Sequence, residues 1–320
     1  MAKIGVFDSG YGGLTILKEI RKELPQYDYL YLGDNGRAPY GTRSFEVIYR
    51  YTLQAVKYLF EQDCALVILA CNTASAKALR TIQQRDLPQI NLQRQTTNDK
   101  RPVNVLGVIR PTVEAVPAIT KTGHVGILAT PATVSSESYV LELKKPTPNN
   151  VLRTATGSPI EQSSSPVKGR ELIITQQACP LWVPLIEAGE QDSEGAKYFI
   201  SKYLRELLAK DPQIDTLVLG CTHYPLMKTQ IDKWLAFHHE IEESEFPEPV
   251  ETPRVKTIAQ GELEAKSLAD YLQRHPEYSE QLSQGGKCTY LTTENADRFA
   301  QSASLFIGEK ISAESISLED

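Results

Sequence analysis

The sequence contains few cysteines, and none of them are paired in a short motif. Its five cysteines are spread along 320 residues without a CxxC spacing. An odd, scattered set is typical of reduced thiols, and it argues against a disulfide framework or a cysteine zinc site. We therefore expect a cytoplasmic protein with no bound metal.

Long apolar runs and an excess of basic residues are also missing. No run approaches the roughly 18 apolar residues that a membrane span needs. The N-terminal segment MAKIGVFDSG is too short in apolar residues for a signal peptide and lacks a cleavage site. The 34 Lys and Arg residues are outnumbered by 40 Asp and Glu, with no basic stripe to follow a phosphate backbone. We expect neither a membrane nor a nucleic acid as a partner.

The order of apolar and polar patterns predicts the fold class. A chain of 320 residues has room for about two domains, at roughly 150 residues each. Strand-like apolar runs alternate with helical patterns, which predicts an α/β fold of mostly parallel sheets covered by helices. We expect two pseudo-symmetric αβα domains, the first made of residues 1–104 and 253–320 and the second of 105–252. The active site is expected in the interdomain cleft.

Three polar stretches interrupt this alternation. Residues 90–104 are polar and aperiodic, 145–170 are rich in proline and serine, and 238–254 are acidic and contain proline. Such composition predicts surface insertions, linkers or loops. The adjacent histidines His238 and His239 lie in the acidic stretch, where a solvated loop explains them better than a metal site.

Two similar stretches present a cysteine at the end of an apolar run. The first is LVILACNTASA with Cys71, and the second is LVLGCTHYPL with Cys221, 150 positions later. Each reads as a short buried strand, then a cysteine, then Asn or Thr side chains able to cap a following helix. A helix dipole there would lower the thiol pKa toward neutrality and favour a reactive thiolate. One such cysteine is most often inert core, but two in matching contexts indicate function.

A glycine loop follows the first predicted strand. The segment DSGYGG, which begins at Asp8, matches neither a dinucleotide fingerprint nor a P-loop. Tight chain packing alone explains its glycines. As a site, it fits a small anionic ligand held by backbone N–H groups, with Asp8 as a proton partner or amine acceptor.

Two further side chains are candidates for proton chemistry. His223 lies two residues after Cys221 and could set its protonation near neutral pH, although a lone histidine is more often structural. Glu187 ends the apolar run VPLIE, and its structural alternative is an acid at a helix N-terminus, stabilised by the dipole.

Several segments together resemble a known family. GVFDSGYGGLTILKEI, APYGTRS, ACNTASA, ILATPATVSSESY, ACPLWVPLIEAG and VLGCTHYPL resemble, in order, segments of the glutamate racemases of the aspartate/glutamate racemase superfamily. The matches run from residue 4 to residue 225, and the segment LTTENADRFA near the C-terminus is a weaker match. Each segment alone is a weak signal, but the ordered set is specific.

The resemblance implies a cofactor-independent racemisation of glutamate by two opposed cysteine bases. Cys71 would act on D-glutamate and Cys221 on L-glutamate, with Asp8 assisting Cys71 and with Glu187 and His223 on the Cys221 side. The residues implied to bind substrate are Asp8, Ser9, Tyr40, Gly41, Asn72, Thr73, Thr130, Thr133, Thr222 and His223. No lysine stands where a pyridoxal phosphate Schiff base would be indicated. A homodimer that supplies D-glutamate for peptidoglycan, and so for the cell wall and cell shape, is also implied.

Departures from the family pattern leave alternatives open. The family motif beside Glu187 often has a second acid where this chain has Ala188, which weakens the assignment of Glu187. Another amino-acid or hydantoin racemase of the superfamily is the nearest alternative. Two alternatives come from other classes of protein. One is a thiol hydrolase that uses Cys221 and His223, which needs only one cysteine. The other is a binding protein of two hinged lobes, which would bind a ligand without exchanging its α-proton.

Overall fold

The computed structural model describes residues 1–96, 101–143, 172–245 and 254–318. Within these ranges the chain forms two compact units. The first comprises residues 1–109, 221–223 and 260–320, and the second comprises 110–220 and 224–259. The tripeptide that contains Cys221 therefore groups with the first unit, although the strand before it belongs to the second. The domain boundaries expected from the sequence stay a prediction.

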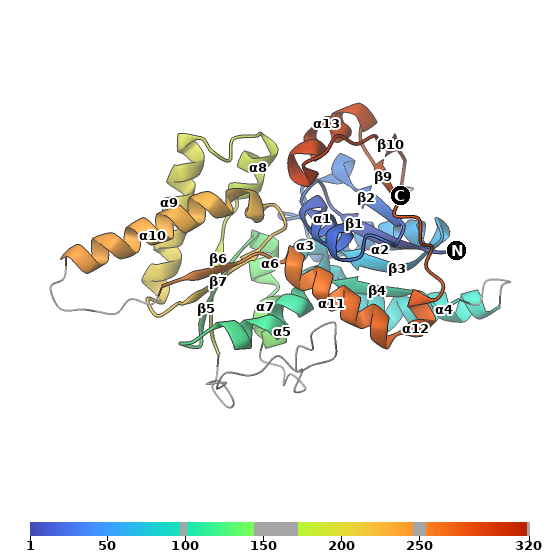
Figure 1. The fold of residues 1–320 in the computed structure, drawn as a ribbon, viewed down its shortest axis with the longest axis horizontal. Helices are drawn as coiled ribbons and strands as arrows, with labels where there is room; N and C mark the ends of the chain where they lie inside the picture. Colours follow the sequence, from blue (N-terminus) through green and yellow to red (C-terminus); the bar gives the residue numbers. More distant parts are fainter. Residues whose placement is uncertain (97–100, 144–171, 246–253, 319–320) are drawn as a thin grey trace. The chain divides into compact units, whose positions relative to one another are not determined.

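The first unit is built on a six-stranded parallel sheet (Figure 1). Its strands, in spatial order, are β10 (Glu314–Ser315), β9 (Cys288–Thr292), β2 (Tyr29–Gly33), β1 (Lys3–Asp8), β3 (Cys64–Leu69) and β4 (Asn104–Gly107). Every residue of β2 and β3 is buried, as expected for parallel strands covered on both faces. This sheet forms the core that carries the candidate site.

Helices cover this sheet in the first unit. They are α1 (Gly13–Glu23), α2 (Phe45–Glu61), α3 (Asn72–Ala74), α4 (Leu87–Gln95), α11 (Gly261–Arg274), α12 (Pro276–Ser279) and α13 (Ala296–Ile307). Short helical segments η1 (Asn35–Arg37), η2 (Ser75–Leu79) and η3 (Ile82–Asp86) join them. Helix α2 contacts β1, β2 and β3, while α1 packs against α11 and α13 (Figure 1). Helices from the two ends of the chain are thus part of one core.

The second unit has a four-stranded parallel sheet in the order β6 (Ile173–Ala178), β5 (His124–Ala129), β7 (Thr216–Gly220) and β8 (Lys256–Ile258). Its helical segments are α5 (Ile109–Ile119), which begins at the unit boundary, α6 (Pro131–Ser135), α7 (Ser138–Leu143), α8 (Trp182–Glu187), α9 (Glu194–Lys210), η4 (Tyr224–Met227) and α10 (Lys228–Glu245). The order β6-β5-β7-β8 repeats the order β2-β1-β3-β4 of the first unit. The expected α/β fold with two parallel sheets is confirmed.

Parts of the expected polar loops are helical. Residues 87–95 form α4, and α10 continues to Glu245. The solvated loop expected around His238 and His239 was therefore wrong, because an acidic segment can also form a helix. The insertion or linker expected at 90–104 stays a prediction. The stretch 145–170 lies outside the described residues. Glu137, whose φ is +52°, lies between helices α6 and α7. None of the described helices is long and apolar enough to cross a membrane.

Candidate active site

Asp8 and Cys71 lie at the carboxyl ends of the two central strands of the first sheet. Asp8 ends β1, and Cys71 follows β3, the strand paired with β1. The chain leaves β1 for β2 on one side and returns to β3 on the other, so the strand order reverses between β1 and β3. Open α/β sheets bind ligands at this type of switch point. Both side chains are almost fully buried there.

The Cys71 thiol begins its own helix. Its Sγ accepts a hydrogen bond from the backbone N–H of Ala74 at 3.4 Å and lies 3.3 Å from the hydroxyl oxygen of Ser9. The expectation that Asn or Thr would cap this helix was wrong, because Cys71 itself occupies the N-cap position. The cap and the Ser9 hydroxyl hold the sulfur at one place beside the strand end.

The environment raises, rather than lowers, the pKa of Cys71. Burial is the largest cause, the neighbouring Asp8 carboxylate is the second, and together they bring the pKa of the thiol to about 12. The Ser9 hydroxyl and the Ala74 N–H favour the thiolate but do not offset these effects, and Cys221 raises the pKa further. The expected shift toward neutrality was wrong, since desolvation and the Asp8 charge outweigh the effect of the helix N-terminus. Cys71 therefore rests as a protonated thiol.

The second cysteine turn packs onto the glycine loop of the first unit. The Thr15 hydroxyl donates to the backbone carbonyl of Thr222 at 2.8 Å. A Cβ atom at Gly12 would lie only 2.4 Å from both Nδ1 of His223 and Oγ1 of Thr222, so only glycine allows this approach. The sequence explained the loop glycines by tight chain packing, and this contact is one instance of it.

His223 is held beside Cys221 by an aromatic contact. Its Nδ1 atom lies 3.8 Å from the Sγ atom of Cys221, within the range of a sulfur hydrogen bond. The imidazole meets the ring of Phe306 edge to face, with centroids 5.4 Å apart. Phe306 also stacks on Tyr11, which belongs to the glycine loop. Helix α13 thus supports both His223 and the loop after Asp8.

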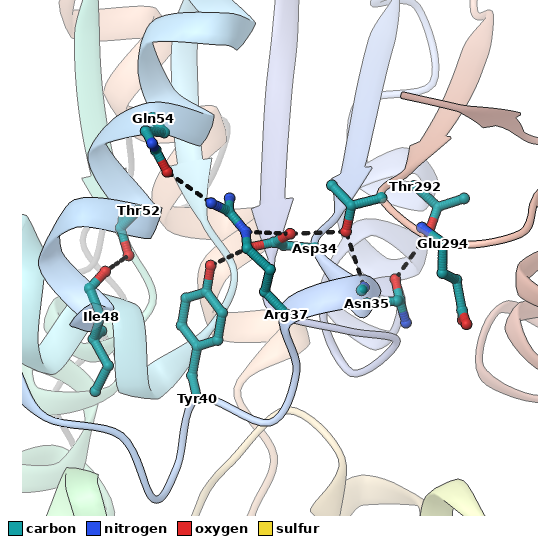
Figure 2. Close-up of polar contacts among 11 residues, drawn as sticks. Asp34, Asn35, Arg37, Tyr40, Ile48, Thr52, Gln54, Thr292 and Glu294 are labelled. Carbon is teal, nitrogen blue, oxygen red and sulfur yellow. Dashed lines mark hydrogen bonds and ion pairs between the residues drawn. The ribbon is translucent and has the colours of Figure 1, made fainter. Parts of the chain in front are cut away.

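Tyr40 is fixed by a buried carboxylate at the end of β2, as Figure 2 shows. The Tyr40 hydroxyl donates to Asp34, which is fully buried and also accepts from Nε of Arg37 at 2.8 Å and 3.0 Å and from the Thr293 hydroxyl at 2.8 Å. Burial, and then the Asp34 charge, raise the pKa of Tyr40. The phenol therefore stays protonated, and the loop before Gly41 is anchored to the sheet.

The other predicted residues after Cys71 are buried in the same place. Asn72 and Thr73 are 2% and 4% exposed, and the side-chain amide of Asn72 donates to Gln260 at 2.6 Å. Gln260 and Asp34 were not among the residues predicted from the sequence. Asp34 could have been found, because it follows β2 as Cys71 follows β3. No pattern in the sequence around Gln260 indicates a role in the site.

The remaining predicted site residues lie in the second unit. Thr130 and Thr133 are buried at the end of β5, with their hydroxyl oxygens 3.1 Å apart, and Thr130 caps α6. Glu187 is exposed and is the last residue of α8. The structural alternative given for it was wrong, because a helix C-terminus does not stabilise an acid.

A metal centre finds no support in the part of the chain that the structure describes, where no three His, Cys, Asp or Glu side chains gather as metal ligands. The side chains of His238 and His239 lie outside that part.

Comparison with known proteins places this arrangement in a family. The model of the Asp/Glu/Hydantoin racemase family matches residues 14–238. This chain belongs to that family. The glutamate racemase of Ruegeria sp. (strain TM1040) is 38% identical over 321 residues, covering 97% of this chain and 98% of the relative. The glutamate racemase of Geobacter metallireducens is 35% identical over 308 residues, covering 96% and 93%. The resemblance seen in the sequence is confirmed.

Solved structures of the family share the fold over nearly the full length. The glutamate racemase of Francisella tularensis, crystallised with D-glutamate, gives a TM-score of 0.74 at 29% identity and covers 99% of this chain and 98% of its own. The glutamate racemase of Aquifex pyrophilus gives 0.67 at 30% identity, with 98% of each chain covered. The arrangement of two parallel sheets is therefore that of the family.

Proposed function

We propose that this protein interconverts L-glutamate and D-glutamate without a cofactor, using Cys71 and Cys221 as two bases. The observation that carries the proposal is that each thiol follows a buried central strand and that the turn of Cys221 packs against the glycine loop after Asp8. Inversion at carbon needs a proton taken from one face and a proton given to the other. Two buried thiols supply both functions.

The high pKa of Cys71 suits this chemistry. A thiol that rests protonated is a ready proton donor, and once deprotonated it is a stronger base than an ordinary thiolate. The α-proton of an amino acid is far less acidic than a thiol, so a strong base lessens the mismatch. To act on D-glutamate, Cys71 would first give its proton to Asp8, its proton partner. The Cys71 thiolate would then take the α-proton while the Cys221 thiol gives a proton to the opposite face, which leaves Cys71 protonated and Cys221 as the thiolate.

Neighbouring side chains would assist each cysteine. Asp8 is the proton partner of Cys71, since its carboxylate lies close enough to raise the thiol pKa. His223 serves Cys221, which acts on L-glutamate, and the 3.8 Å contact supports that role. Glu187 belongs to the same side in the family pattern. Its exposure makes it the weakest of these assignments.

Polar groups around the thiols would hold the substrate. The carboxylates and the amine of glutamate need donors and acceptors that stay fixed while negative charge builds up at the α-carbon. The residues that we assign to this task are Asp8, Ser9, Tyr40, Gly41, Asn72, Thr73, Thr130, Thr133, Thr222 and His223. Among them, Ser9, Tyr40 and Asn72 are held by hydrogen bonds within the first unit.

The biological setting follows from the reaction. D-Glutamate is a component of peptidoglycan, so we propose that the protein serves cell wall synthesis and cell shape. The family resemblance supports a homodimer, and the scattered unpaired cysteines support a cytoplasmic location. The relatives named as glutamate racemases support glutamate over aspartate or a hydantoin as the substrate.

Turnover assays with single enantiomers test the proposal. The purified protein is incubated separately with L-glutamate, D-glutamate and L-aspartate, and the products are resolved by chiral chromatography. We expect equal amounts of the two glutamate enantiomers from either starting point and little change in aspartate. Faster turnover of aspartate would assign another racemase activity, and binding without turnover would reject catalysis.

A further inference from the structure

A buried glutamine holds the side chain that follows Cys71. The Oε1 atom of Gln260 accepts a hydrogen bond from Nδ2 of Asn72 at 2.6 Å, and its Nε2 atom donates to the backbone carbonyl of Val108 at 3.0 Å. Gln260 is 1% exposed. Its side chain therefore bridges the end of β3, where Asn72 lies, and the end of β4, where Val108 lies.

This chain of hydrogen bonds fixes the orientation of both amides. A backbone carbonyl can only accept, so the group of Gln260 that faces Val108 must be its NH₂. The oxygen of Gln260 then faces Asn72, and the group of Asn72 that meets it must be the NH₂ of that residue. The carbonyl oxygen of Asn72 is turned away from Gln260 as a result. The Val108 carbonyl therefore decides which group of each amide donates and which accepts, whichever way the two amides are assigned.

The position of Gln260 in the fold does not explain its residue type. Gln260 is the N-cap of α11, where Ser, Thr, Asp or Asn would stabilise the helix through a side-chain hydrogen bond. The Gln260 side chain makes no such bond. Helix α11 is also firmly seated, since a Cβ atom at Gly261 would lie 2.9 Å from the Glu19 side chain of α1. The glutamine is thus presented to Asn72 from a rigid element.

We infer that Gln260 is a positioning residue that sets the orientation of the Asn72 amide for substrate binding. The inference rests on the proposed function, in which Asn72 binds glutamate beside Cys71. An amide that is free to rotate offers the substrate the wrong group part of the time and must be ordered when the substrate binds. Gln260 holds the amide in place before the substrate binds, so binding does not lose the entropy of ordering it.

Kinetic analysis of two substitutions tests the inference. Gln260→Met keeps the length of the side chain but removes both hydrogen bonds. Gln260→Ser introduces a preferred N-cap residue whose hydroxyl is too short to reach Asn72. For both variants we expect KM for glutamate to rise on the order of tenfold, with kcat within about threefold of the wild type, because a ground-state contact is lost. The thermal midpoint of Gln260→Ser should fall less than that of Gln260→Met, because its N-cap hydrogen bond offsets part of the cost of the two lost buried hydrogen bonds.

A double-mutant cycle separates positioning from a structural role. In an Asn72→Ala background, Gln260→Met should change KM by less than about twofold, because its target is gone. The matched control is Gln177→Met, which removes a buried glutamine bonded to Glu206 and to the Ala178 carbonyl in the second unit. We expect it to leave KM unchanged.

The outcomes distinguish the two levels of the proposal. A wild-type protein that does not racemise glutamate overturns both the proposed function and this inference. A wild type that racemises glutamate, with KM unchanged in both Gln260 variants, overturns the inference alone. Equal effects of Gln260→Met with and without Asn72 also contradict it, since Gln260 would then act by another route. Loss of kcat at constant KM, with a lower thermal midpoint, would indicate a structural role only.

Discussion

Glu264 is a buried acid that should make the stability of the fold depend on pH. It lies on α11 at 2% exposure, and one of its carboxyl oxygens is buried without a hydrogen-bond partner. Burial raises the pKa of its carboxyl group from 4.5 to about 8. In the folded protein Glu264 is therefore protonated at neutral pH, whereas in the unfolded chain it is ionised.

The size of the effect follows from that difference in pKa. A change of one in pKa corresponds to about 1.4 kcal/mol, so a rise from 4.5 to about 8 costs about 5 kcal/mol once the group must ionise. Between these values the folded state binds more protons than the unfolded state, so stability falls as pH rises. The stability that the protonated Glu264 side chain gives the folded state, relative to the ionised side chain, is fully present below pH 4.5 and is lost as pH rises through about 8.

Glu264→Gln removes the ionisation and keeps the shape of the side chain. We expect the variant to gain stability relative to the wild type as pH rises from 5 to 9, by several kcal/mol across this window. The assay is urea unfolding of both proteins at each pH, followed by the change in the transition midpoint. Glu262→Gln, at an exposed position in the first turn of the same helix, is the control and should show no such trend. A constant difference between the wild type and Glu264→Gln from pH 5 to 9 would refute the reasoning.

Two further substitutions test how the site is held. Gly12→Ala places a methyl group 2.4 Å from Nδ1 of His223, so the histidine must shift, and we expect kcat/KM to fall on the order of a hundredfold in a steady-state assay. An unchanged kcat/KM would mean that the glycine loop moves enough to accommodate the methyl group. Asp34→Asn leaves the mostly buried Arg37 guanidinium without its carboxylate and should destabilise the fold by about 3 kcal/mol, seen as a lower thermal midpoint. Asp270→Asn, which removes an exposed ion pair, should cost less than about 1 kcal/mol, and equal losses would contradict this account.

The sequence was most informative where apolar runs meet polar strand ends. The runs before Asp8, Cys71 and Cys221 form central strands of parallel sheets, because a strand buried on both faces leaves a continuous apolar pattern. The same logic would have identified Asp34, which follows β2. These residues were accessible to prediction because each lies beside a local signal.

Features that depend on tertiary contacts were not predictable in this way. The raised pKa of Cys71 arises from burial beside Asp8, 63 positions earlier in the chain, and a local helix dipole gave the opposite expectation. Gln260 meets Asn72 only because α11 returns to the first sheet late in the chain. The helical parts of the polar stretches were missed because composition alone does not separate a solvated helix from a loop.

Exchange of the α-hydrogen in deuterated water tests the two-base mechanism most directly. L-Glutamate and D-glutamate are incubated separately with the wild type, Cys71→Ser and Cys221→Ser, and deuterium at the α-carbon is measured by mass spectrometry. The account predicts that the wild type incorporates deuterium from either enantiomer and that each substitution severely reduces racemisation. Full racemisation after the loss of either cysteine would contradict it.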